Sequence, residues 1–271
     1  MKLAFSTLGS PKWDIEQTAR LAQQYGYDGV ELRIYQGKVI PADMPADERR
    51  YIKQTFADHG IAVCCVSAST RFSSADEGER SRQEDELRRY MDLARDLDSP
   101  LVRTFGGQMP EGVDEHVVFA YVAESLQRVA EQSAGSGVNV VLETHDAFSS
   151  GRTVNAVLSR VAATNVGALW DTHHPYRSGE TAEQTYQLLR DRLMHTHVKD
   201  ARRKDDGWQL VLLGEGEVPV AEVLQTLQGH GYDGWVCVEW EKMWHPDIED
   251  PEVALPQHIK LLRRYLGMAG N

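Results

Sequence analysis

Short apolar runs alternate with helix-like segments along the whole chain, and this alternation limits the possible folds more than any other feature of the sequence. The segments between the runs carry apolar residues at three- and four-residue spacing, as at Leu87, Tyr90, Met91 and Ala94. Such alternation is typical of βα units that build a parallel sheet. The apolar runs lie near residues 2–6, 29–34, 61–67, 100–105, 138–143, 166–170, 193–198 and 234–239.

Eight runs predict an α/β fold in which eight parallel strands close into a (β/α)8 TIM barrel. The length of 271 residues suits one such barrel, so we expect a single barrel domain over residues 1–271. Pro251 suits the start of the last helix, but Pro256 implies that the helix proper begins near residue 256. Three longer connections follow strands and should lie as loops over the catalytic face: residues 35–47, 67–80 and 199–218.

The charge balance disfavours nucleic acid as a partner. The chain has 29 Lys and Arg against 41 Asp and Glu, a formal net charge of -12, which opposes contact with a phosphate backbone. No stretch approaches the ~20 apolar residues of a membrane helix, and the N-terminal apolar run is too short for a signal peptide. We therefore expect a soluble cytoplasmic protein with no membrane partner. Its cysteines, without Cys-x-x-Cys spacing, should be reduced and packed in strands: Cys64, Cys65 and Cys237.

Four of the predicted strands end in acidic or imidazole side chains, namely Glu143, Asp171, His197 and Glu239. The carboxyl ends of parallel barrel strands meet at one mouth, so we expect these groups to converge. Three carboxylates together would repel one another, and a divalent cation would remove that cost. This donor set suits Mn²⁺, Mg²⁺ or Co²⁺, with Zn²⁺ as an alternative. Any one of the four alone would be interpreted as a solvated charge, but their common position favours one metal site.

Other polar residues near the strand ends allow more than one interpretation. Arg103 and His145 could contact substrate hydroxyls or brace loops, and Lys199 could contact substrate or form a surface ion pair. His195 shares a strand face with His197 and is expected to be a core or supporting histidine, not a metal ligand. Glu31 is left outside the site, because the sequence does not show which face of its strand it occupies.

Several short motifs resemble the sugar phosphate isomerase/epimerase family of xylose isomerase-like barrels. The resemblance runs from the first strand to the last helix, and its motifs are Asp171-Thr-His-His174, His197-Val-Lys-Asp200, Gly214-Glu-Gly216 and Val238-Glu-Trp-Glu241. Family members bind one divalent metal through a glutamate, an aspartate, a histidine and a second glutamate. The resemblance implies that role for Glu143, Asp171, His197 and Glu239 here. Of the metals that suit this donor set, we expect Mn²⁺.

The same resemblance implies substrate contacts and a reaction. His174 and Arg203 match the spacing of family residues that bind substrate oxygens, although a shift of one residue would put Arg202 in place of Arg203. The paired glutamates Glu143 and Glu239 would remove and return a proton next to a carbonyl through a metal-stabilised enediolate. The resemblance also leaves a homo-oligomer open.

These features predict a divalent-metal-dependent isomerase or epimerase of a keto-sugar, a sugar phosphate or a keto-cyclitol. One alternative is a metal-dependent lyase on the same site, either a keto-cyclitol dehydratase or a carbon-glycoside cleaving enzyme. Another is a non-catalytic barrel that binds a sugar or a partner. An endonuclease is disfavoured, because Tyr35 and residues 67–71 stand where that branch of the family needs extra histidines.

Overall fold

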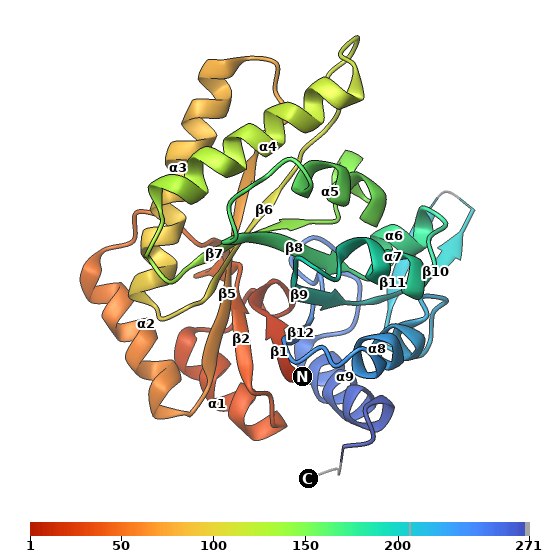
Figure 1. Cartoon of the computed structure of the whole chain (residues 1–271). Coiled ribbons are helices and arrows are strands. Elements are labelled where there is room, and N and C mark those ends of the chain that lie inside the picture. Colours follow the sequence, from red (N-terminus) through yellow and green to blue (C-terminus); the bar gives the residue numbers. More distant parts are fainter. Residues whose placement is uncertain (206, 269–271) are drawn as a thin grey trace.

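Eight parallel strands close into a barrel in the computed structural model, which describes residues 1–205 and 207–268 (Figure 1). Their order around the barrel is β1-β12-β9-β8-β7-β6-β5-β2. Each predicted apolar run overlaps one of these strands, and the predicted (β/α)8 TIM barrel is confirmed. The strands are β1 (Lys2–Ser6), β2 (Gly29–Leu32), β5 (Ala62–Arg71), β6 (Leu101–Phe105), β7 (Asn139–Glu143), β8 (Val166–Asp171), β9 (Leu193–Val198) and β12 (Trp235–Val238).

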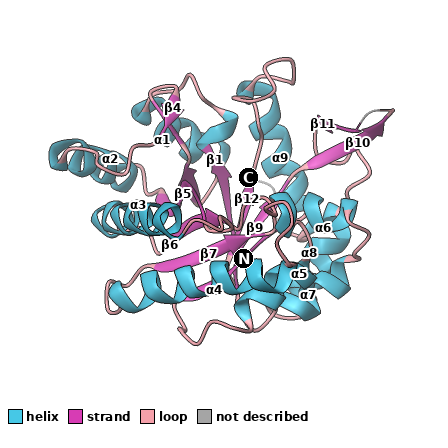
Figure 2. Ribbon diagram, turned by 90° about the horizontal axis from the view of Figure 1, so that it is seen from above, coloured by secondary structure: helices cyan, strands magenta, loops and turns pink. Residues whose placement is uncertain are grey.

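Helices form an outer layer around the strands (Figures 1 and 2). They are α1 (Ile15–Tyr25), α2 (Ala46–Asp58), α3 (Glu77–Asp96), α4 (Glu115–Gln132), α5 (Gly151–Leu158), α6 (His173–Arg177), α7 (Ala182–Leu189), α8 (Val220–Gly229) and α9 (Pro251–Tyr265), with 3-10 turns η1 (Thr7–Gly9) and η2 (Asp146–Phe148). Among the described helices, none is long and apolar enough to cross a lipid bilayer. Residues 206 and 269–271 of the expected single-barrel range lie outside the described residues.

The last helix begins earlier than Pro256 predicts. Helix α9 starts at Pro251, the first helical position, where a proline costs no backbone hydrogen bond. Pro256 lies inside the helix and removes one backbone donor there. Burial of Leu255, Ile259 and Leu262 against the barrel offsets this loss, so packing outweighs the local preference.

Two of the long connections contain hairpins that the sequence analysis did not predict. One pairs β3 (Ile34–Tyr35) with β4 (Lys38–Val39), and the other pairs β10 (Asp200–Lys204) with β11 (Gly207–Val211). Asp200 holds the base of the second hairpin, because its carboxylate accepts four backbone N–H groups, from Ala201 at 2.8 Å, Gly214 and Gly216 at 2.9 Å and Val218 at 3.1 Å. A side chain at Gly216 would overlap the Asp200 carboxylate, which accounts for glycine in that motif.

We expect Asp200→Ala to lower the free energy of unfolding by about 3 kcal/mol, because four donors lose a charged acceptor. Urea denaturation followed by circular dichroism measures this change. Asp205→Ala, at an exposed position near the tip of the same hairpin, is the matched control and should change stability little. Equal stability of the two variants would show that Asp200 does not hold the hairpin.

Inside the barrel, an apolar layer lies toward the amino ends of the strands, and a polar layer lies at their carboxyl ends, which form the mouth. Seven residues form the apolar floor: Ala4, Cys64, Cys65, Leu101, Val141, Leu169 and Cys237. Every second residue of a strand faces the same side, so the residue two positions after a floor residue also faces inward. That relation places Arg103, Glu143, Asp171 and Glu239 at the mouth, two positions after Leu101, Val141, Leu169 and Cys237. The three cysteines are free and buried, as expected.

Candidate active site

Four side chains from neighbouring strands converge at the mouth of the barrel. Glu143 ends β7, Asp171 ends β8, His197 lies near the end of β9, and Glu239 directly follows β12. Each offers one ligand-type atom, and these four atoms lie within 4.8 Å of one another. All four side chains are buried. The structure therefore brings together the whole set that the sequence analysis placed at one mouth.

Several atoms of this set lack hydrogen-bond partners among the described residues. Among them are both carboxylate oxygens of Glu143, Oδ2 of Asp171 and Nδ1 of His197. That nitrogen lies 3.4 Å from Oε1 of Glu143 and 3.4 Å from Oε1 of Glu239. Buried acceptors without donors are costly, and a shared cation would satisfy them together. Three carboxylates with one imidazole fit Mn²⁺, Mg²⁺ or Co²⁺, and also Zn²⁺.

Lys199 places a buried ammonium group against the same carboxylates. Its Nζ lies 2.9 Å from Oδ2 of Asp171, 2.7 Å from Oε2 of Glu239 and 2.6 Å from Oε1 of Glu241. Burial alone would lower the pKa of Lys199, but these carboxylates raise the pKa well above its usual value. The alternative of a surface ion pair is wrong, because Lys199 is only 2% exposed.

The carboxyl groups of the site have different proton affinities. Burial raises the pKa of Asp171 to about 6, helped by the neighbouring charges of Glu239 and Glu143 and opposed by Lys199. Burial would also raise the pKa of Glu239, but Lys199 and His197 hold that pKa well below its usual value. Burial would lower the pKa of His197, but Glu31 and Glu239 raise it well above the ordinary range. The site therefore concentrates negative charge around one imidazole and one ammonium group.

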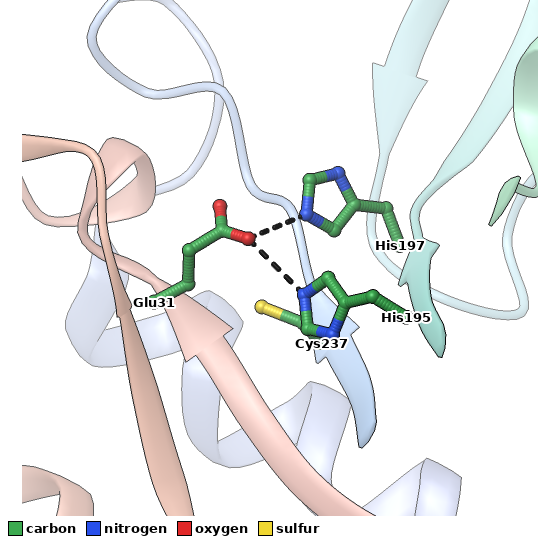
Figure 3. Close-up of side chains that lie close together, drawn as sticks. All are labelled: Glu31, His195, His197 and Cys237. Atoms are coloured by element: carbon green, nitrogen blue, oxygen red, sulfur yellow. Dashed lines mark hydrogen bonds and ion pairs between the residues drawn. The ribbon is translucent and has the colours of Figure 1, made fainter. Parts of the chain in front are cut away.

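Glu31 is a fourth buried carboxylate at the site, one that the sequence analysis left outside it. Its Oε2 lies 2.8 Å from Nε2 of His197 and 3.1 Å from Nε2 of His195 (Figure 3). Val30 and Leu32, its neighbours on β2, belong to the outer core, so Glu31 faces inward. This alternation is the signal in the sequence that could have placed it. His195 is buried beside Glu31, as expected for a core histidine.

Three of the expected substrate contacts gather beside Glu143 and Asp171. Nε of Arg103 lies 3.3 Å from Oε2 of Glu143, and Nε2 of His174 lies 3.9 Å from Oδ2 of Asp171. The ring of the half-buried His145 lies 4.7 Å from that of His174, centre to centre. Burial, followed by the charge of Lys199, holds the pKa of His174 well below its usual value, so its ring is neutral near pH 7.

Arg203 lies farther out, on the β10-β11 hairpin, where it is exposed. It is paired with Trp208 across the hairpin, and directly opposed residues share one face. The Trp208 ring packs on His173 of α6, with ring centres 5.1 Å apart, so the face that carries Arg203 is turned toward α6. Arg202 lies on the other face and donates to the Glu215 carbonyl. Within the described chain, no ion pair joins Arg203 to the four converging residues.

The chain is similar in sequence to sugar epimerases and dehydratases and similar in fold to solved structures. Fructoselysine 3-epimerase of Escherichia coli O157:H7 is 23% identical over 276 residues, which cover 98% of each protein. Inosose dehydratase of Bacillus licheniformis is 30% identical over 158 residues, which cover 52% of this chain and 50% of that protein. The crystal structure of the IOLI protein with a binding zinc atom shares the fold, with a TM-score of 0.80, 18% identity and 98% of each chain covered.

The family model described as xylose isomerase-like TIM barrel matches residues 19–265. The match covers β2 to β12 and every residue of the converging set. The chain therefore belongs to the xylose isomerase-like TIM barrel family.

Proposed function

We propose that this protein is a divalent-metal-dependent isomerase or epimerase that acts on a keto-sugar, a sugar phosphate or a keto-cyclitol. The observation that carries the proposal is the buried convergence of Glu143, Asp171, His197 and Glu239 within 4.8 Å. The similarity to a fructoselysine 3-epimerase over nearly the whole chain supports the reaction type. The zinc atom in the IOLI structure supports a divalent metal, without fixing which one.

One divalent cation held by these four residues would polarise a substrate carbonyl and acidify the adjacent C–H group. Glu143 on β7 and Glu239 after β12 flank the site, because β8 and β9 lie between their strands. One glutamate removes the proton from one face of the substrate carbon, and the other returns a proton to the opposite face. The centre is thereby inverted. A positioned general base typically contributes about 10²–10⁴-fold in rate.

The surrounding polar residues would orient the substrate. Both ring nitrogens of His174 are buried and have no hydrogen-bond partner in the described chain. A neutral imidazole can accept one hydrogen bond and donate another, so His174 suits a sugar hydroxyl. Arg103 and Lys199 are buried cations that would stabilise negative charge on substrate oxygens. We propose that His145 and Arg203 contact the outer end of the substrate.

A lyase is the second candidate, because the inosose dehydratase is 30% identical to about half of the chain. The two reactions share the first proton removal and differ in whether a neighbouring hydroxyl departs. Incubation with candidate keto-sugars and keto-cyclitols in heavy water, followed by mass spectrometry, separates them. An epimer that carries deuterium supports the epimerase, and a product lighter by one water supports the lyase. Neither product from any of these substrates, with metal bound, would favour a non-catalytic barrel.

A further inference from the structure

Glu31 lies beneath the converging residues and touches two histidines with one oxygen (Figure 3). Its Oε2 is 2.8 Å from Nε2 of His197 and 3.1 Å from Nε2 of His195. All three side chains have 0% exposure. They come from β2 and β9, so they join two separate parts of the barrel wall below its mouth.

The chemistry of these contacts fixes which nitrogen of His197 carries hydrogen. A carboxylate can only accept hydrogen bonds, so Nε2 of His197 must be the N–H donor to Glu31. The opposite nitrogen, Nδ1, is then the one that can give up its proton and offer a lone pair to a metal ion. This nitrogen lies 3.4 Å from Oε1 of both Glu143 and Glu239, so it is the nitrogen of His197 that faces the converging carboxylates.

We propose that Glu31 is a positioning residue that holds His197 in the tautomer and ring orientation in which Nδ1 binds the divalent metal. This inference rests on the proposed function. Carboxylates that accept the second N–H of a ligating histidine also raise its basicity, and their loss typically weakens metal binding about 10–100-fold. Glu31 therefore controls metal affinity without touching the metal.

His195 supplies the second anchor of Glu31. Its Nε2 donates to the same carboxylate oxygen that receives the hydrogen bond from His197. The carboxylate oxygen can only accept, so Nε2 of His195 carries an N–H as well. Two donors on one oxygen leave the carboxylate little freedom to rotate. The orientation of the His197 ring is thus fixed by Glu31 and His195, which are both buried from solvent.

A second metal site in the same place is the competing interpretation. Ligand-type atoms of Glu31, His195, His197 and Cys237 also lie within 4.8 Å of one another. The Cys237 Sγ, however, donates its hydrogen to the Val238 carbonyl at 3.8 Å. A protonated thiol is a poor ligand, because metals bind the thiolate. The contacts of Glu31 therefore fit hydrogen bonds, and one metal per chain is expected.

The test compares Mn²⁺ affinity by titration calorimetry in the wild type, Glu31→Gln, Glu31→Leu and Cys237→Ser. Glutamine keeps an acceptor oxygen but loses the charge, so we expect about tenfold weaker binding. Leucine loses the acceptor, and we expect about 100-fold weaker binding. Cys237→Ser alters a neighbour of the same rings without removing their partner, and its affinity should match the wild type. Melting temperatures without added metal show that each variant folds.

The visible absorption spectrum of bound Co²⁺ gives a second readout, since a tilted or reprotonated imidazole changes the ligand field. A role in folding alone would lower the melting temperature and leave both affinity and spectrum unchanged. If Glu31→Leu does not fold, Glu31→Gln decides the question, and an affinity within twofold of wild type overturns the inference.

Two other results would also overturn the inference. Two metals per chain in the wild type, with one lost in Cys237→Ser, would make Glu31 a ligand of a second site. Absence of Mn²⁺ binding by the wild type would overturn the proposed function and this inference with it. By contrast, tight wild-type binding that Glu31 variants leave unchanged would overturn this inference alone.

Discussion

Replacing Glu143 or Glu239 with glutamine is expected to lower kcat by about 10²–10⁴-fold once a substrate is known. Glutamine keeps the size of the side chain and an oxygen, but it cannot take up a proton. The two carboxylates flank the site from β7 and β12, so each should serve one face of the substrate. Steady-state kinetics at saturating Mn²⁺ measures the effect. Glu124→Gln, at an exposed position on α4, is the matched control.

Deuterium uptake from heavy water tests the role of each glutamate separately. A variant that keeps only one of the two glutamates should still exchange deuterium into the epimer whose C–H faces the remaining base, without forming the other epimer. Loss of exchange from both epimers in a metal-loaded variant would contradict separate roles for the two glutamates. A kcat within tenfold of wild type for both variants would contradict proton transfer by either one.

The second large effect is expected at Lys199. Lys199→Met removes the ammonium group that lies within 3 Å of Asp171, Glu239 and Glu241 and leaves their buried charges uncompensated. We expect the free energy of unfolding to fall by about 3–5 kcal/mol at pH 7. Urea denaturation without added metal measures it, and Lys204→Met on the exposed end of β10 is the control.

The loss at Lys199 should depend on pH. Burial opposes ionisation of Glu241, but Lys199 lowers its pKa to about 2. A carboxyl group whose pKa is depressed in the folded state adds stability above its unfolded pKa of about 4.3, and this stability disappears as pH falls toward the folded pKa. The difference between wild type and Lys199→Met should therefore be full near pH 7 and shrink between about pH 4.5 and about pH 2. A difference that stays constant over this range would contradict the assignment.

The sequence predicted the barrel and the four converging residues for a simple physical reason. Parallel strands carry their carboxyl ends to one mouth, and a residue two positions after an inward apolar residue also faces inward. This logic holds for Glu143, Asp171 and Glu239, which follow Val141, Leu169 and Cys237 of the barrel floor.

Glu31 escaped this logic because the residue two positions before it is Gly29, which has no side chain on the barrel floor, and because the neighbouring strand β5 is irregular. The register shifts between Val30 and Glu31, and both Cys64 and Cys65 reach the barrel floor. The extra residue of this bulge lies on β5, so it disturbs the alternation of β5, while Val30 and Leu32 of β2 still leave Glu31 facing inward. The β10-β11 hairpin was missed for another reason, since Asp200 fixes its base through contacts with Gly214, Gly216 and Val218, distant in the sequence.

The most direct test of the central claim is the metal content of the protein after incubation with Mn²⁺ and removal of free ions. Elemental mass spectrometry would compare the wild type with His197→Ala and Glu239→Gln. We expect one Mn²⁺ per wild-type chain and a large loss in both variants, because each removes a donor from the set that converges within 4.8 Å. A wild type that binds no Mn²⁺, Co²⁺ or Zn²⁺, or variants that keep one full equivalent, would contradict the proposed metal centre.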